Sequence, residues 1–455
     1  MSDLAARSEL GPPTTGTAVV TGRAHEGRGR AKAKLQGAQP PFRLRAAMSG
    51  MGEAPGKVWF FELAAAVIDA DRCVRCGACV AACPSDSIGV GRDDLPLLVK
   101  MCTGCSLCWD FCPRGGLRYE TTWRLAAPGG PGPEAGLPPM LTGDPDDPCG
   151  AGDLGALLGT ASARVRSGQP WRAPGAQDGG VVTAILLAAL EAGEIDGAVV
   201  ARPDPRTPWR AVPFVARTSQ DLLKAAGSFY NQTMALAALD LARAGLEPDA
   251  RVAVVGTPCE IQGIRALQAR TWRRGASRVD AVVLSVALLC TKSFDYRRLM
   301  VEELSARRGV DLRRIGKIDI TDGRLVVLDA EGQPVVDEPV RSFRGAALKG
   351  CDECADFLGR AADLAVGSVG SPKGWSSVLV RSAAGAAALR RASPALELAE
   401  LADPGALERL DRLDKRASAS ALRRPLDPDG PMFIDFADHL SGYAESDRAP
   451  VWRGR

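Results

Sequence analysis

Short apolar runs alternate with amphipathic stretches over the last two thirds of this chain, and this pattern predicts an α/β fold. Buried strands are predicted at 196–201, 252–255, 282–289, 363–366 and 377–381. Apolar residues at helical spacing predict helices over 180–192 and 236–244, and a further helix that starts at Glu260. The segment 315–329 predicts a strand pair, with Asp322-Gly323 as its turn.

Shifts in composition divide the chain into segments. The predicted divisions are a disordered basic leader at 1–57, a cysteine-rich unit at 58–125, a Pro/Gly-rich linker at 126–148, two parts of one α/β domain at 149–225 and 226–424, and an irregular tail at 425–455. An alternative for the leader is that translation starts at Met48 or Met51. The length of 455 residues, 46% of them hydrophobic, is enough for two or three domains with cores.

Net charge and residue composition exclude several classes of function. The net charge is only +3, which argues against a nucleic-acid partner. No apolar run is long enough to span a bilayer and no secretory signal is recognisable, so we expect a soluble, cytoplasmic protein without a transmembrane segment. The chain has two histidines, His25 and His439, both in predicted tails, which leaves no histidine for catalysis in the core. Thirteen cysteines without an export signal indicate metal ligands or redox thiols, and not disulfides.

Eight of the cysteines form two copies of the pattern C-x2-C-x2-C-x3-C-P. The copies are Cys73, Cys76, Cys79 and Cys83, and Cys102, Cys105, Cys108 and Cys112. In this pattern three thiolates hold one 4Fe-4S cluster and the fourth reaches the other cluster. We therefore assign Cys73, Cys76, Cys79 and Cys112 to one cluster, and Cys102, Cys105, Cys108 and Cys83 to the other. The unit resembles the bacterial two-cluster ferredoxin module, and the alternative is a pair of zinc ribbons.

Four more cysteines follow in the predicted α/β domain. Cys259 and Cys290 each follow a predicted strand, and Cys351 and Cys354 form a CxxC pair. Because parallel strand ends converge at one sheet edge, the four can form a single thiolate site. Spacing alone leaves open two buried cysteines plus a redox dithiol or half a zinc site. Cys149 is interpreted as a bystander.

Three glycine-rich turns are candidates for binding a phosphate, although each can be an ordinary turn. They are Asp178-Gly179-Gly180, Gly256-Thr257-Pro258 and 367–374. A fourth match, G-x-G-x-x-G at 150–155, has no strand before it and is interpreted as fortuitous.

At these same residues the chain resembles the coenzyme F420 hydrogenase/dehydrogenase beta-subunit family. The matching stretches are 178–200, 225–232, 252–267, 288–299 and 348–370, within 145–400. The resemblance implies an α/β (α+β) flavin-binding domain, preceded here by the small two-cluster ferredoxin-like domain. It also implies FAD that exchanges hydride with coenzyme F420, and a third 4Fe-4S cluster on Cys259, Cys290, Cys351 and Cys354. The flavin residues carried over are Gly179, Gly180, Thr183, Ser228, Tyr230, Gly256, Thr257, Pro258 and Lys349.

The sequence leaves three functions open. The first is an oxidoreductase that passes electrons between reduced coenzyme F420 and a one-electron acceptor through FAD and the clusters. Asp178 and Phe229 stand where the family usually has serine and lysine, so a ferredoxin-dependent reductase of a larger, chlorophyll-type substrate is the second. The third is an electron relay without a substrate. The expected partners are coenzyme F420 or another small redox substrate, and ferredoxin or a redox partner subunit. No side-chain acid or base is assigned a catalytic role.

Overall fold

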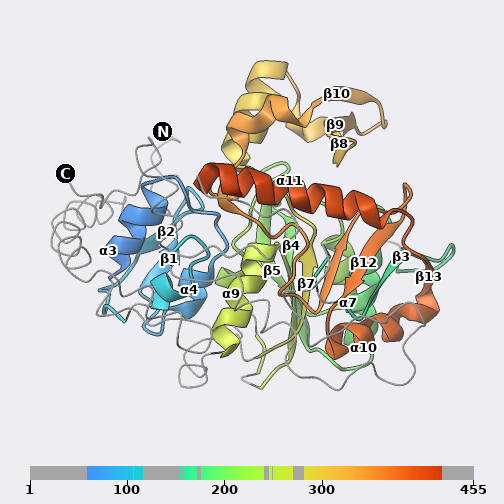
Figure 1. The fold of residues 1–455 in the computed structure, drawn as a ribbon, viewed down its shortest axis with the longest axis horizontal. Coiled ribbons are helices and arrows are strands. Elements are labelled where there is room, and N and C mark those ends of the chain that lie inside the picture. Colours follow the sequence, from blue (N-terminus) through green and yellow to red (C-terminus); the bar gives the residue numbers. More distant parts are fainter. Residues whose placement is uncertain are drawn as a thin grey trace, which may run out of the picture.

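The computed structural model describes residues 59–105, 107–115, 154–155, 157–171, 176–239, 245–247, 249–269 and 281–422. The predicted leader, the linker at 126–148, Cys149 and the tail at 425–455 lie outside these residues. The described residues form a mixed α/β fold with a small cysteine-rich module packed beside it, coloured blue in Figure 1.

An eight-stranded sheet forms the centre of the larger part, in the order β13-β3-β12-β11-β7-β6-β4-β5. Its strands are β3 (Gly159–Val165), β4 (Gly197–Pro203), β5 (Ala211–Ala216), β6 (Val252–Gly256), β7 (Val282–Leu288), β11 (Leu364–Gly367), β12 (Ser376–Val380) and β13 (Leu396–Ala399). Strands β4, β6, β7 and β11 are parallel, and the outer strands pair antiparallel. The carboxyl ends of the four parallel strands therefore share one edge, where open α/β sheets bind ligands.

Both faces of the central strands are buried, because successive residues of a strand point to opposite faces. On β6, Val252 and Val254 face the hydrophobic core that holds α9 (Pro258–Ala269) and the start of α11 (Pro404–Leu422). Ala253 faces the opposite core, formed by α7 (Val181–Glu191) and α10 (Ala383–Ala392). Burial on both faces explains why these strands are continuous apolar runs in the sequence.

A second, three-stranded sheet has a separate core. It consists of β8 (Ile315–Thr321), β9 (Arg324–Asp329) and β10 (Pro334–Pro339), with the π-helix η7 (Arg297–Arg307) and the 3-10 helix η9 (Val340–Ala346) against it. Asp322 and Gly323 have φ values of 50° and 70°, the left-handed backbone that a tight β-hairpin turn requires. The strand pair predicted over 315–329 is confirmed.

The cysteine-rich module is built from short elements. They are α3 (Phe60–Leu63), η3 (Ala64–Ile68), α4 (Ala78–Ala82), β1 (Ile88–Val90), β2 (Pro96–Leu98) and α5 (Leu107–Asp110). Val74, Ala78 and Ala81 of the module share one hydrophobic core with Leu236 and Ile261 of the larger part. The module is therefore packed onto the α/β domain, and not tethered loosely to it.

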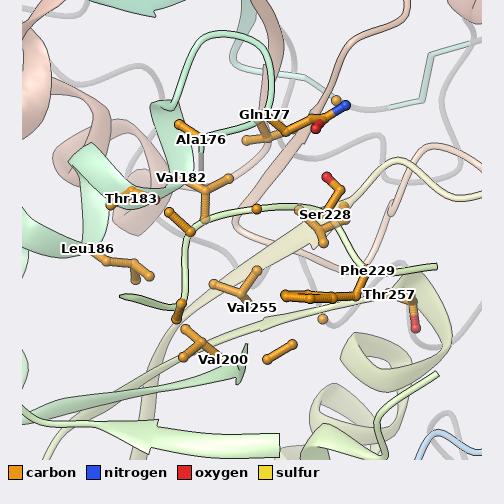
Figure 2. Close-up of a pocket in the computed structure, with 18 of the residues that line it drawn as sticks. Ala176, Gln177, Val182, Thr183, Leu186, Val200, Ser228, Phe229, Val255 and Thr257 are labelled. Carbon is orange, nitrogen blue, oxygen red and sulfur yellow. The ribbon is translucent and has the colours of Figure 1, made fainter. Parts of the chain in front are cut away.

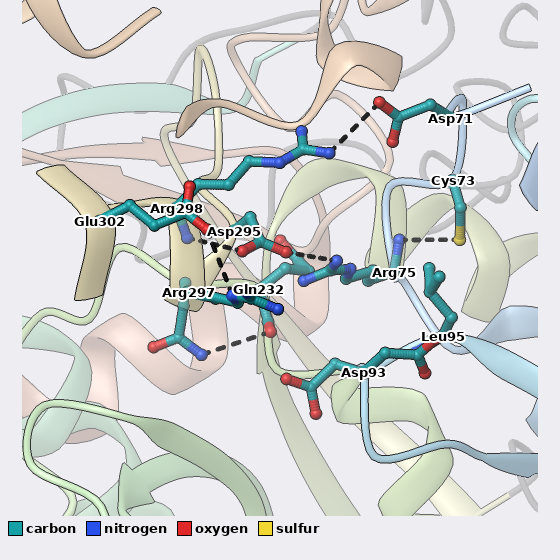
Figure 3. Close-up of polar contacts among 12 residues, drawn as sticks. Asp71, Cys73, Arg75, Asp93, Leu95, Gln232, Asp295, Arg297, Arg298 and Glu302 are labelled. Atoms are coloured by element: carbon teal, nitrogen blue, oxygen red, sulfur yellow. Dashed lines mark hydrogen bonds and ion pairs between the residues drawn. The ribbon is translucent and has the colours of Figure 1, made fainter. Parts of the chain in front are cut away.

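Ion pairs reinforce this contact. Arg72 and Glu353 are both fully buried and pair through two contacts of 2.9 Å. Arg75 Nη2 lies 2.6 Å from Asp295 Oδ2, and Figure 3 shows this pair beside the contact of Arg298 with Asp71. The loop that begins the first cysteine motif is thus held on both sides by the larger part.

Most predicted elements are confirmed, with one difference. The helix predicted over 236–244 begins instead as the 3-10 helix η4 (Ala235–Ala238), and 240–244 lie outside the described residues. The backbone is left-handed at Met234, directly before η4, and η4 packs against Gly77 of the module. Tertiary packing here overrides local periodicity. Across the described ranges, no helix is both long and apolar enough to cross a lipid bilayer.

Candidate functional site

The structure divides the eight module cysteines into two groups of four. One small cavity is lined by Cys73, Cys76, Cys79 and Cys112, and a second by Cys83, Cys102, Cys105 and Cys108. The last cysteine of each motif lies at the cavity of the other motif, because a short helix separates it from its own cavity. Cys83 follows α4, and Cys112 follows α5. The four cysteines at each cavity are those that the motif spacing groups together.

Backbone N–H groups point at the sulfur atoms of both groups. Ser87 N lies 3.2 Å from Cys83 Sγ, and the N–H groups of Arg75, Gly104 and Arg114 each lie 3.4 Å from the sulfur of the cysteine two residues earlier. These donors favour thiolate, the form that binds iron. Gly104 has a φ of 67° and lies against the Trp59 ring, so a side chain would not fit at this turn.

Burial opposes the thiolate form in the described structure. It raises the pKa of the Cys76, Cys79 and Cys108 thiols well above the ordinary value and that of Cys112 to about 12, and negative charge on neighbouring cysteines adds to the shift for the first three. Four buried thiols that face one another become stable thiolates when a cation cluster binds between them. The donor set therefore fits a 4Fe-4S cluster at each cavity.

A third cavity is lined by the four remaining described cysteines, Cys259, Cys290, Cys351 and Cys354. Cys259 lies in the first turn of α9, Cys290 follows β7, and the CxxC pair lies on and directly after the 3-10 helix η10 (Lys349–Glu353). The expected convergence at the sheet edge is observed. Burial raises the pKa of Cys259 and Cys290 well above the ordinary value and that of Cys351 to about 11.

The three groups of cysteines lie in series. Val74 lines both the cavity of Cys73, Cys76, Cys79 and Cys112 and the third cavity. Cys79 of that group and Cys108 of the other module group lie in one hydrophobic cluster. The group of Cys73, Cys76, Cys79 and Cys112 is therefore the middle one. Arg114 is buried, lines the third cavity and lies two residues after Cys112, so it lies between the middle and third groups.

A larger cavity of about 200 Å³ lies at the carboxyl ends of the parallel strands. Val200, Val255, Leu288 and Val366 contribute apolar walls, and the start of α7 forms one side. Figure 2 shows the ring of Phe229 lying between Val255 and Thr257 in this space. Apolar walls, a helix N-terminus and a few polar groups are the features of a site for a flat organic cofactor.

Five of the predicted flavin residues line this cavity: Gly180, Thr183, Ser228, Gly256 and Thr257. The other four lie elsewhere. Gly179 supports the site from behind, because a Cβ there would come within 2.3 Å of Ala163 O. The Tyr230 hydroxyl accepts a hydrogen bond from Ile320 N, Pro258 lines the third cysteine cavity, and Lys349 pairs with Asp71 at 3.1 Å.

Two polar residues at the cavity, Gln232 and Ser293, were not singled out from the sequence. Gln232, Thr257 and Ser293 line both the large cavity and the third cysteine cavity, so they form the wall between the two. Gln232 and Ser293 lie within stretches that resemble the family, 225–232 and 288–299, and the position of Ser293 three residues after Cys290 was the available signal.

Two carboxylates of the cavity are perturbed. Burial raises the pKa of Glu260 to about 7, against hydrogen bonds from Thr257 and Ala235 that lower it. Burial also raises the pKa of Asp178, with the nearby Asp319 carboxylate adding to the effect and Lys317 opposing it. Asp178 has a φ of 47°, a left-handed backbone that is uncommon for residues other than glycine.

Comparison with known proteins places this geometry in a family. Models of the coenzyme F420 hydrogenase/dehydrogenase beta subunit match residues 163–240 (N-terminal part) and 249–404 (C terminus), and a 4Fe-4S dicluster domain matches residues 66–118. The coenzyme F420 hydrogenase subunit beta of Methanothermobacter thermautotrophicus is 36% identical over 48% of this chain and 75% of its own length.

Two further relatives extend the comparison. The coenzyme F420-dependent sulfite reductase of Methanocaldococcus jannaschii is 30% identical over 79% of this chain, which spans about half (51%) of that enzyme. A chain of the xenon-derivatised F420-reducing NiFe hydrogenase complex from Methanosarcina barkeri superposes with a TM-score of 0.52 at 31% identity, over 58% of this chain and 90% of the other. The chain thus belongs to the coenzyme F420 hydrogenase/dehydrogenase beta-subunit family of oxidoreductases, and it carries a 4Fe-4S dicluster domain ahead of the family's two domains.

Proposed function

We propose that this chain is an iron–sulfur flavoprotein that exchanges a hydride with coenzyme F420 and passes the electrons singly to a one-electron acceptor. The observation that carries the proposal is the row formed by the large cavity and the three cysteine groups. Each member of the row adjoins the next, through shared lining residues or a shared hydrophobic cluster. Such a series is suited to converting two-electron chemistry at one end into single-electron transfer at the other.

The large cavity is the proposed FAD site. The N-terminus of α7, with Gly180 at its start, offers backbone N–H groups to a phosphate. The apolar residues at the strand ends and the Phe229 ring would hold a flat ring system and exclude water from it. A bound flavin supplies hydride exchange with a deazaflavin and release of electrons one at a time. The described residues of the cavity include no histidine, and none is required to deliver a proton in this scheme.

The cysteine groups are the proposed ligands of three 4Fe-4S clusters. The third group lies next to the cavity across the wall of Gln232, Thr257 and Ser293, and Cys259 packs against the hydrophobic cluster that contains Cys76 of the middle group. The group with Cys83 and Cys102 is the most distant from the cavity in this series, and its neighbour Met101 is 80% exposed. We propose this end as the exit to a redox partner. A hydrogenase complex among the solved relatives supports the idea of a partner subunit.

Anaerobic mixing of the FAD-reconstituted protein with reduced coenzyme F420 tests this function. We expect the absorbance of oxidised F420 to grow while the iron–sulfur absorbance bleaches, with two electrons delivered to the clusters for each hydride. Flavin and clusters present without any reaction would mean that F420 is the wrong substrate, and a ferredoxin-fed reductase of a larger organic molecule would become the leading function. Failure to bind flavin at all would indicate a plain electron relay.

A further inference from the structure

The wall between the large cavity and the third cysteine cavity is one hydrogen-bonded chain. Gln232 Nε2 donates to Thr257 Oγ1 at 3.1 Å, and Thr257 Oγ1 lies 3.2 Å from Cys259 Sγ. At the other end Ser293 Oγ donates to Gln232 Oε1 at 2.8 Å and lies 3.9 Å from Cys290 Sγ. One buried amide therefore links the hydroxyl groups beside two cysteines of the same group.

The Gln232 amide fixes the direction of the hydrogen bonds along this wall. The amide nitrogen of Gln232 faces Thr257, whose hydroxyl oxygen accepts its hydrogen bond. The amide oxygen faces Ser293 and accepts a hydrogen bond from the Ser293 hydroxyl. The Thr257 oxygen already accepts from Gln232, so its own hydrogen can point to Cys259 Sγ or to Glu260 Oε2, which lies 3.1 Å away.

Cys259 and Cys290 therefore differ in whether a hydroxyl group can donate a hydrogen bond to their sulfur atoms. Cys259 has a hydroxyl donor within reach, whereas the Ser293 hydrogen is directed away from Cys290. Hydrogen bonds donated to the sulfur ligands of an iron–sulfur cluster stabilise its more negative, reduced state and raise its reduction potential. The amide therefore controls how many donors the sulfur atoms next to the cavity receive.

We propose that Gln232 is a positioning residue that keeps the Thr257 hydroxyl within hydrogen-bonding reach of Cys259, holds the Ser293 hydroxyl away from Cys290, and so sets the reduction potential of the cluster that faces the cavity. The inference rests on the proposed function for the presence of that cluster. The inference also assigns the step at which electrons leave the large cavity. Among the described lining residues, Gln232, Thr257 and Ser293 are the only ones that the large cavity shares with the third cysteine cavity.

The variant Gln232→Glu tests the direction of the chain. A carboxylate accepts from both hydroxyl groups, so the Thr257 hydrogen turns away from Cys259, and the added negative charge further disfavours the reduced cluster. Potentiometric titration of the anaerobically purified holoprotein, followed by EPR, should show the ratio of reduced to oxidised third cluster fall at least about tenfold at a fixed potential, which is 59 mV for one electron. The cluster of Cys83, Cys102, Cys105 and Cys108 should not shift.

Three further variants complete the experiment. Thr257→Val keeps the shape and removes the donor without adding charge, so it should lower the same potential, and Thr257→Ser should restore it. Gln333→Glu, at an exposed glutamine before β10, adds the same carboxylate and should change none of the clusters.

The outcomes separate this inference from the function on which it rests. Three clusters in the parent protein, with a lowered third potential in Gln232→Glu and Thr257→Val, support the role of Gln232. Three clusters with an unchanged third potential overturn that role and leave the proposed function standing. Only two clusters in the parent protein overturn both.

Discussion

Arg72 and Glu353 form the most buried ion pair between the module and the α/β domain. Arg72 directly precedes Cys73, and Glu353 directly precedes Cys354, so one contact ties together the ligand loops of two neighbouring cysteine groups. Its two hydrogen bonds of 2.9 Å are charge-assisted and bidentate. Removing one partner leaves a buried charge without compensation, which costs far more than the loss of an exposed pair.

We therefore expect Glu353→Gln to lower the free energy of unfolding by about 3–5 kcal/mol. Urea unfolding of the anaerobic protein, followed by circular dichroism, measures this loss. Glu331→Gln is the control, since Glu331 pairs with Arg314 at 3.7 Å on the surface and should lose no more than about 1 kcal/mol. Equal losses in the two variants would show that the buried pair does not hold the module in place.

At the scale of residues, the sequence predicts those functional residues that occur at a characteristic spacing. The eight module cysteines were found in this way, because their motifs are local. For Cys259, Cys290, Cys351 and Cys354 the spacing left alternatives open, and the family resemblance implied a single site. Gln232 and Ser293 were not found, because their hydrogen bond joins residues 61 positions apart, and a lone glutamine carries no spacing signal. Tyr230 and Lys349 matched the family pattern, yet their side chains are held by Ile320 and Asp71, away from the cavity.

Among the strands of the large sheet, the parallel strands and the antiparallel β12 were predicted from the sequence, whereas the antiparallel strands β3, β5 and β13 were not. Strands β6 and β7 are continuous apolar runs because helices cover both faces. Strand β3 reads as a weak mixture of small and polar residues, and it is stabilised by pairing with β12 and β13, more than 200 residues later in the chain. Pairing between strands so far apart in the sequence depends on the assembled sheet, so the local sequence of β3 does not predict it.

The contact of helix α4 with helix α9 depends on a glycine. A Cβ at Gly263 would lie 2.8 Å from the Ala78 Cβ and 3.1 Å from Leu236, so the two helices can approach only without a side chain here. We expect Gly263→Val to separate them and to destabilise the protein by about 1–3 kcal/mol or more, through overpacking. Hydrogen exchange should become faster in α4, which carries Cys79 and precedes Cys83.

The matched control for this contact is Gly345→Val. Gly345 is exposed, and a Cβ there would meet nothing within 4 Å. This variant should leave exchange in α4 unchanged. If Gly263→Val also left it unchanged, the helices would have room that the structure does not show, and the shared core would not be what fixes the module.

At the scale of the whole molecule, the shared core and the buried ion pairs have one consequence. They hold the row of cysteine groups at fixed spacing, because the loop of Cys73 and Cys76 is attached to the domain that carries Cys259. A module that moved freely on a linker would transfer electrons only on encounter. The packing seen here is suited to the proposed electron transfer over fixed distances, so the clusters proposed for the middle and third groups should depend on each other for transfer.

Removing a ligand of the third group tests this series. Cys290→Ser should lose one cluster and lower the iron content from about 12 to about 8 atoms per chain, at four per cluster. Reduced coenzyme F420 should still reduce the flavin, while bleaching of the two module clusters should be lost, because the step next to the cavity is missing. Stopped-flow absorbance under anaerobic conditions resolves the two signals. Cys149→Ser, at the predicted bystander, should change neither. If the module clusters were reduced at the parental rate in a Cys290→Ser protein with eight iron atoms, electrons would reach the module by another route, and the third group would be a structural site beside the path.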